Sequence, residues 1–421
     1  MFTYQAIIYT LCIFLILYLP RVFCWVASLK AQNKLINTKK NKFAICIPAR
    51  NEGDAVLPLL NSLQNQTYDK SLFDVYIVVK DPNDIVIEYG HKYGAEVFVD
   101  ETQTCKGNCL DYTFKQLIEK YPEKYAGVII VDADCVLKDN FLEEMNNAMA
   151  SGAEVINAKK VVGNYFLNNG KDSNLITASN GLIWTLMDDM GNRWKSDHGF
   201  TTMTISTGIF ISYRIIKEIG GWKYNQTLTE DMEFQRDCCV NQWKTFYYSY
   251  AQFYMQEAPS LEETNKRRNR WMNGLIHSDF IYAKRMLANK SLHCRIDNYF
   301  IFSLWIVYFF VAIELGLGII NIAVFAFNKI FRGIWSWKLL GIAFSAIGIV
   351  YSAYLVMTLV ALFIARNDTK LTYRDFLKVL FYHPIFYLGY TKIVFKSIFS
   401  KKKLEWDSIK RVDSAFEERA K

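Results

Sequence analysis

The sequence lacks several patterns that would place it in familiar classes of protein. It contains no internal repeat and no low-complexity linker, so neither a repeat architecture nor a string of loosely tethered domains is predicted. It also has no zinc-finger spacing and no base-reading motif, so nucleic acid is not an expected partner. The hydrophobic segments are few and show no inverted repeat, which argues against a transporter.

A disulfide framework is also missing, although the chain has nine cysteines. Cys46 and Cys135 lie in or beside apolar, strand-like runs. Cys105 and Cys109 come closest to a metal-ligand pair, but no second pair and no nearby histidine completes a site. We therefore expect free, reduced thiols, which favours a cytosolic location for the central part of the chain.

Hydrophobic residues are abundant, at 52% of the 421 residues, and aromatic residues reach 16%. The excess is concentrated in blocks at both ends of the chain. The formal net charge is +8, and lysine and arginine cluster beside these apolar blocks. This arrangement suits contact with an anionic lipid bilayer. The length allows one large domain plus membrane segments.

Residues 1–29 are predicted to form an N-terminal transmembrane helix. Arg21 is the only charge between Phe2 and Leu29, and about 20 apolar residues are enough to span a bilayer. A cleaved signal peptide is disfavoured because no basic region precedes the apolar run and no small-residue cleavage site follows it. The positive-inside rule places the N-terminus outside and the chain from residue 30 in the cytoplasm. The basic residues behind this inference are Lys30, Lys34, Lys39, Lys40 and Lys42.

Short apolar runs alternate with helical patterns through the next hundred residues. This alternation predicts an α/β domain with a doubly wound, mostly parallel sheet, which we place at residues 30–290. Ligands of such sheets bind outside the carboxyl ends of the strands. The expected strands are 43–48, 73–79, 96–99 and 127–131, and the expected helices are 56–64 and 106–120.

A second membrane region is predicted at residues 291–400, with spans near 299–327 and 337–365. Glu314 is the one acidic residue inside these spans, so we expect it to face protein or a polar cavity. The basic stretch 266–290 has the pattern of a helix lying on a membrane surface. Charged residues and Pro384 interrupt the stretch 376–400, which favours an interfacial or re-entrant helix. Residues 401–421 are expected to be a basic cytoplasmic tail.

Asp132 and Asp134 directly follow the fourth expected strand. Alternate residues of a strand point to opposite faces, so a turn must begin here for both carboxylates to reach one ligand. Mg²⁺ and Mn²⁺ prefer oxygen ligands, often one or two carboxylates together with phosphate oxygens and water. The alternative is that Asp134 caps a helix and Asp132 is merely solvated.

Five segments, in order between residues 43 and 271, resemble family-2 glycosyltransferases with a GT-A fold. This family includes the membrane-bound hyaluronan, chitin, cellulose and poly-N-acetylglucosamine synthases. The segments are Pro48-Ala-Arg-Asn-Glu52, Lys106-Gly-Asn-Cys-Leu110, Asp132-Ala-Asp134, Gly220-Gly-Trp222 with Leu228-Thr-Glu-Asp231, and Arg267-Arg-Asn-Arg-Trp271.

The resemblance implies a site for a UDP-sugar donor and for Mg²⁺ or Mn²⁺. Asp132 and Asp134 would hold the metal and the diphosphate. Ser206-Thr207-Gly208 either lines the acceptor pocket, where glycine lets a sugar approach closely, or forms a simple turn. The remaining donor-binding residues would be Pro48, Ala49, Arg50, Glu52, Asp81, Lys106, Arg267, Arg270 and Trp271.

Asp231 is the candidate general base, with Glu230 beside it, because an attacking hydroxyl must lose its proton. The alternative is a structural helix start, with Thr229 as N-cap and the acids in the first turn. Both interpretations can hold together. Trp222 and Trp271 either stack on sugar rings or pack in the core.

Three positions depart from the family pattern. Arg267 replaces the glutamine of Gln-x-x-Arg-Trp. This glutamine helps to define the processive subgroup, so the replacement counts against processive chain elongation. Lys80-Asp-Pro-Asn-Asp84 replaces the Gly-Ser-Thr turn of the family, so the aspartate that would contact the uracil is not fixed by the motif. We place this contact at Asp81. Trp406 to Arg411 resembles the family's gating segment, but Ile409 stands in place of a threonine.

We therefore expect an inverting, metal-dependent transferase that adds a sugar of the GlcNAc or glucose type to a growing polysaccharide at the cytoplasmic membrane face. Transfer of one sugar to a lipid-linked acceptor is the alternative, and an inactive membrane scaffold is a weaker one. An accessory membrane subunit is a further partner that the sequence leaves open.

Overall fold

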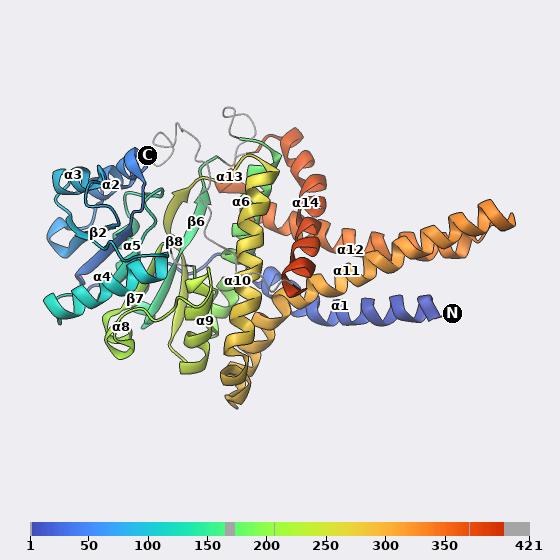
Figure 1. Ribbon diagram of the computed structural model, residues 1–421, viewed down its shortest axis with the longest axis horizontal. Helices are drawn as coiled ribbons and strands as arrows, with labels where there is room; N and C mark the ends of the chain where they lie inside the picture. The colour runs from blue at the N-terminus through green and yellow to red at the C-terminus, as the bar shows by residue number, and fades with distance from the viewer. Residues whose placement is uncertain (1, 165–172, 206, 370, 400–421) are drawn as a thin grey trace.

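The computed structural model describes residues 2–164, 173–205, 207–369 and 371–399. An α/β domain lies at one end of the molecule, and three long helices project together from its other side (Figure 1). The predicted tail 401–421, including the segment from Trp406 to Arg411, lies outside the described residues, as does Ser206.

One mixed sheet organises the α/β domain, with the strand order β3-β2-β1-β4-β7-β6-β8-β5. The first four strands in this order are parallel, and β7 joins them antiparallel to β4. Strands β6 and β8 are parallel to each other, while the short β5 runs antiparallel to β8. The predicted α/β GT-A-like architecture with a mostly parallel sheet is thus confirmed. The strands are β1 Phe43–Pro48, β2 Phe73–Val79, β3 Glu96–Val99, β4 Gly127–Ile130, β5 Val136–Leu137, β6 Val155–Val162, β7 Ile209–Ser212 and β8 Thr245–Met255.

Helices cover both faces of the sheet because successive strand residues point to opposite sides. In β1, Phe43 and Ile45 belong to a core with the helices α2 (Leu57–Gln64) and α5 (Phe141–Ala148). Ala44 and Cys46 belong to a second core with α4 (Lys106–Lys120) and α8 (Tyr213–Ile219). The strand is therefore buried on both faces, as a doubly wound sheet requires.

Three helices are long and apolar enough to cross a membrane: α1 (Phe2–Ala27), α11 (Leu292–Arg332) and α12 (Trp337–Ile364). Arg21 of α1 bonds Ser303 of α11 at 2.8 Å, whereas Thr10 bonds Glu314 further along. A lower residue number in α1 thus contacts a higher residue number in α11, so the two helices are antiparallel. Glu314 is buried and faces protein, as predicted.

A layer of helices joins this bundle to the sheet, and α10 and α14 lie within it (Figure 1). The stretch 376–400 falls within one continuous helix, α14, although Pro384 lies inside it. Its interfacial placement, like the proposed domain limits, stays a prediction. The joining helices are α6 Leu175–Met187, α7 Asp189–Asp197, α9 Glu230–Asn241, α10 Leu261–Ala288, α13 Arg366–Thr369 and α14 Tyr373–Phe399; the others are α3 Val86–Lys92 and the 3₁₀ helices η1 Gly53–Val56, η2 Lys70–Leu72 and η3 Met149–Ser151.

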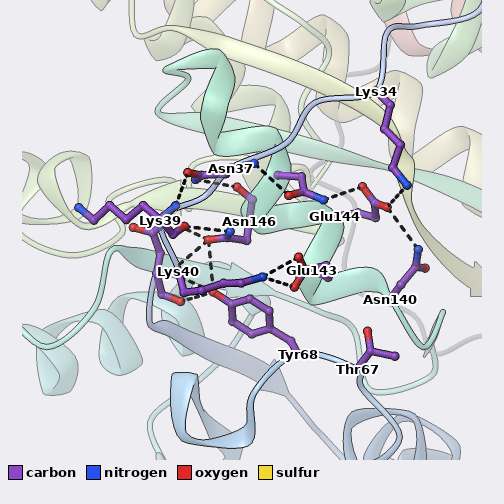
Figure 2. Close-up of polar contacts among 12 residues, drawn as sticks. Lys34, Asn37, Lys39, Lys40, Thr67, Tyr68, Asn140, Glu143, Glu144 and Asn146 are labelled. Atoms are coloured by element: carbon purple, nitrogen blue, oxygen red, sulfur yellow. Dashed lines mark hydrogen bonds and ion pairs between the residues drawn. The ribbon is translucent and has the colours of Figure 1, made fainter.

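The segment after α1 is bound to the α/β domain along α5 (Figure 2). Asn37 donates from its side chain to the Asn146 carbonyl at 3.0 Å. Lys40 pairs with Glu143 at 2.6 Å, and Lys34 approaches Glu144 to 3.1 Å. Lys34 and Lys40, which were used to predict the orientation of α1 in the membrane, thus form ion pairs within the protein.

The expectation of free thiols is confirmed. All nine cysteines lie in described residues and are free. Cys239 and Cys294 come closest to each other, with their sulfur atoms 3.4 Å apart and not bonded.

Candidate active site

The carboxyl ends of the parallel strands form one edge of the sheet, and the predicted donor segments follow these ends. The pairing extends beyond the strands, since the Ala49 amide donates to the Val78 carbonyl at 2.9 Å and the Val131 amide to the Cys46 carbonyl at 3.0 Å. The chain then turns sharply at Asn51, whose φ of 56° lies in the left-handed region that asparagine tolerates better than most residues. Segments distant in the sequence therefore share one edge.

Lys106 connects the two acidic pairs. It is the first residue of α4 and forms an ion pair with Asp132 after β4. Burial alone would lower the pKa of Lys106, but the nearby carboxylates of Asp132, Glu230 and Asp231 outweigh burial and raise it. Because charges act strongly only at short range, one ammonium group lies among carboxylates from both pairs. The pair Asp132 and Asp134 and the pair Glu230 and Asp231 therefore lie around one ammonium group.

Asp134 belongs to the same group of charged residues. Its side chain is reached by solvent but is surrounded by protein, and this desolvation, together with the charge of Asp132, raises its pKa to about 6. The opposing charges of Arg267 and Lys106 limit the rise. The arrangement favours a cation beside Asp134. The alternative in which Asp134 caps a helix is wrong, because the short strand β5 follows it.

Two arginines of α10 face these acids. Burial lowers the pKa of Arg270, while Glu230, Asp231 and Asp132 act in the opposite direction. Arg267 forms a 3.0 Å ion pair with Glu257, which lies just beyond β8. Both arginines thus bring positive charge close to the acidic residues.

Asp231 lies in the first turn of α9, as the helix-start interpretation predicts. Thr229 occupies the N-cap position, but its side chain makes no capping bond. Thr204 donates its hydroxyl to the Asp231 carbonyl at 3.0 Å. Gly274 of α10 packs so closely on Thr229 that an added Cβ would overlap its side chain. These contacts fix the first turn of α9 against α10.

The remaining predicted donor residues lie at the same sheet edge. Arg50 donates to the Thr104 carbonyl at 3.1 Å, just before α4. Pro48 ends β1, and Glu52 is the N-cap of η1. Asp81 is exposed after β2, where it accepts a 2.8 Å hydrogen bond from the Asn83 amide.

The two tryptophans differ. Trp222 is 1% exposed and packs against Phe114 and Phe234, so the sugar-stacking hypothesis is wrong for this ring. Trp271 is half-buried, and its ring lies edge-on to Trp184 at 5.4 Å.

Sequence reasoning missed Glu257, which is 2% exposed. One carboxylate oxygen accepts from the Trp184 indole at 2.8 Å, and the other pairs with Arg267. Its position after an extended strand is the only sequence signal, and no motif surrounds it.

No cluster of three or more histidine, cysteine, aspartate or glutamate side chains suited to a metal occurs among the described residues. Asp132 and Asp134 nevertheless fit Mg²⁺ or Mn²⁺, because these ions take one or two carboxylates and complete their coordination with phosphate oxygens and water. The raised pKa of Asp134 fits the same interpretation, since a cation would stabilise its charged form.

Known proteins share this organisation. The chain is 24% identical over 375 residues to the probable glycosyltransferase YdaM of Bacillus subtilis, covering 85% of this chain and 82% of YdaM. Among solved structures, the mannosyltransferase PcManGT of Pyrobaculum calidifontis, in complex with GDP-Man and Mn²⁺, superposes with a TM-score of 0.55 at 12% identity, covering 95% of this chain and all of that one. TarS 1–349 of S. aureus in complex with UDP-GlcNAc gives a TM-score of 0.42 at 14% identity, with 88% and 100% covered.

The sequence also matches the family described as "Glycosyl transferase family group 2" over residues 127–365, which is more than half of the chain. This range runs from β4 through both acidic pairs and α10 to the end of α12. The chain therefore belongs to the group 2 glycosyl transferases, and it is a glycosyltransferase.

Proposed function

We propose that this protein transfers a sugar, with inversion at the anomeric carbon, from a UDP-sugar of the GlcNAc or glucose type to an acceptor hydroxyl at the cytoplasmic face of a membrane. The proximity of Lys106 and Arg270 to the carboxylates of Asp132, Glu230 and Asp231 supports the proposal. Three helices able to span a membrane support its location. A growing polysaccharide is the first acceptor to test, and a lipid-linked saccharide is the second.

The donor would lie along the sheet edge. Pro48, Ala49, Glu52 and Asp81 would contact the nucleoside. The basic side chains of Arg50, Lys106, Arg267 and Arg270 would face the diphosphate, since guanidinium groups bind phosphate oxygens in pairs. Trp271 would complete the donor site beside α10.

Asp132 and Asp134 would hold Mg²⁺ or Mn²⁺. When bound, the ion would supply positive charge against the negative charge that develops on the departing diphosphate. The mannosyltransferase from Pyrobaculum is itself in complex with Mn²⁺.

Asp231 would take the proton of the acceptor hydroxyl as that oxygen bonds to the anomeric carbon. The bond between the anomeric carbon and the diphosphate oxygen would break on the opposite side, and its electron pair would leave with UDP. Glu230 and the first turn of α9 would hold Asp231 in place. Inversion follows from this single displacement.

The variant Asp231→Asn tests the assignment. We expect UDP release to fall by roughly 10²–10⁴-fold, because general-base catalysis contributes about this much. Donor affinity should stay within a few fold, as measured by calorimetry. Asp139→Asn, in an exposed loop, is the matched control and should retain activity. Full turnover by Asp231→Asn would remove it from the mechanism.

A donor panel with UDP-GlcNAc, UDP-glucose and GDP-mannose, run with and without EDTA, tests the donor and the metal. GDP-mannose belongs in the panel because the Pyrobaculum relative binds it. Long polymer among the products would support the synthase, whereas products limited to one added sugar would support the second acceptor. If no donor releases nucleotide with any acceptor, the proposed function is wrong.

A further inference from the structure

A pocket lies where the candidate spans meet the joining helices. Its cavity volume is about 90 Å³. Helices α1, α11, α12 and α14 form one side, and α6, α7, α9 and α10 form the other. Apolar and aromatic side chains make up most of its wall, including Tyr308, Tyr354 and Met357.

The pocket carries an excess of positive charge. Arg21, Lys195 and Arg236 line it, and none of the described lining residues is acidic. Arg236 is neutralised by Asp279 at 2.6 Å. Among the described residues, the hydrogen-bond partners of Arg21 are neutral oxygens, those of Phe300 at 2.7 Å and Ser303 at 2.8 Å.

Lys195 is 7% exposed, and its ammonium group has no hydrogen bond or ion pair in the described part of the chain. Its one polar contact is with the face of the Phe300 ring, 4.9 Å away. Burial, reinforced by the charge of Arg21, lowers the pKa of Lys195 to about 8 despite the opposing effect of Asp297. A buried ammonium without a partner is costly, so this wall favours an anionic ligand.

The pocket is connected to the candidate base through Met203 and Thr204. Asn192 and Met203 both line it, and the Met203 amide donates to the Asn192 side chain at 2.7 Å. The next residue, Thr204, bonds the Asp231 carbonyl. A ligand held in the pocket therefore lies against the segment that supports Asp231.

We infer that this pocket binds the phosphate headgroup of an amphiphile, with Lys195 and Arg21 facing the phosphate and the aromatic and methionine wall facing the apolar chain. This step rests on the proposed function: the amphiphile is a lipid carrier, and its acceptor group, which faces Asp231, is an oxygen of that phosphate or a hydroxyl of a saccharide attached to it. Anionic phospholipid and free phosphate share the headgroup chemistry and serve as rival ligands in the test.

The test uses the full-length protein in lipid nanodiscs and a fluorescent long-chain polyprenyl phosphate. We expect saturable binding, at least tenfold weaker binding by Lys195→Met and Arg21→Gln, and near-normal binding by Lys195→Arg. Lys217→Gln, which removes an exposed lysine of α8, is the charge control. The uncharged polyprenol should not compete. Retained donor binding shows that each variant is folded.

Equal binding of polyprenol and polyprenyl phosphate, or full binding by Lys195→Met, would overturn the inference. Equal competition by phosphatidylglycerol or inorganic phosphate would overturn the carrier assignment. Headgroup-dependent binding without any sugar transfer would leave the pocket standing and count against the proposed function. Sugar transfer without headgroup-dependent binding would support the proposed function and overturn the assignment of the pocket.

Discussion

At the scale of single residues, Lys106 holds the candidate site together, because its ammonium lies among carboxylates from two distant segments. Lys106→Met would leave Asp132, Glu230 and Asp231 to repel one another. We predict about a hundredfold lower turnover, the usual effect of losing one preorganised charge. The lower limb of the pH–activity profile should also move to higher pH, since the acids would hold their protons more tightly. UDP release measured across pH checks both effects.

Lys115→Met is the matched control, because Lys115 lies on the same helix and pairs with Asp111 at the surface. An unchanged pH profile in Lys106→Met would mean that Lys106 does not face the acids in solution.

Lys195 gives a prediction about pH. Its pKa of about 8 lies below the ordinary value, so the ammonium loses its proton as the pH rises through about 8. The affinity for polyprenyl phosphate should therefore be full below this pH and should fall above it. The titrating groups around Lys195 are Arg21 and Cys24 of α1, Cys239 of α9 and Asp297 of α11.

Binding titrations between pH 6.5 and about 9.5 check this prediction. Lys195→Arg should give a flat profile because guanidinium keeps its proton throughout. A wild-type profile as flat as that of the arginine variant would show that Lys195 does not contact the headgroup.

Site residues inside sequence motifs were easier to predict than the residues that contact them from other parts of the chain. Asp132, Asp134 and Asp231 follow a strand end or begin a helix, and these local patterns single them out in the sequence. Glu257 has no such pattern, and its role arises only when α10 brings Arg267 to it. Lys195 reads as an ordinary surface lysine in the sequence. Only the packing of α1 and α11 shows that it is buried.

At the scale of elements, the contact of α10 with α9 depends on Gly274. Gly274→Ala would place a methyl group against Thr229, and overpacking of this kind costs roughly 1–3 kcal/mol. We predict a lower midpoint of thermal unfolding in detergent and a loss of activity, because the first turn of α9 would shift. The control is Gly316→Ala in α11, where an added Cβ meets no atom within 4 Å. Similar midpoints for both variants would contradict this packing.

The success of element prediction depended on how apolar each element is. Helix α4 begins and ends where its periodicity predicted, at Lys106 and Lys120. Strand β6 was not predicted, because Lys159 and Lys160 interrupt its apolar run. Lys159 forms an ion pair with Asp189, and Lys160 forms one with Asp188, at the junction of α6 and α7. A sequence pattern cannot show these long-range pairs. Nor does chain order reveal that β7 inserts between β4 and β6.

At the scale of the whole molecule, the antiparallel α1 and α11 give a prediction about orientation. In the proposed arrangement the turn after α11, which begins at Gly333, faces the side opposite the catalytic domain. A protease site inserted after Gly333 should be cut from outside intact cells. The same site placed after Asn37 should be protected until the membrane is permeabilised. The reverse pattern would invert the proposed topology.

The binding of residues 34–42 to α5 has a mechanical consequence. Helix α1, a candidate membrane span, is joined to the sheet by a segment that side-chain hydrogen bonds and ion pairs hold against α5. In a bilayer, the reaction centre would therefore keep a fixed height above the lipid headgroups. An acceptor would react only if its hydroxyl lies at the same height above the membrane. The distance between this hydroxyl and the lipid anchor of the acceptor would therefore determine which substrates are used.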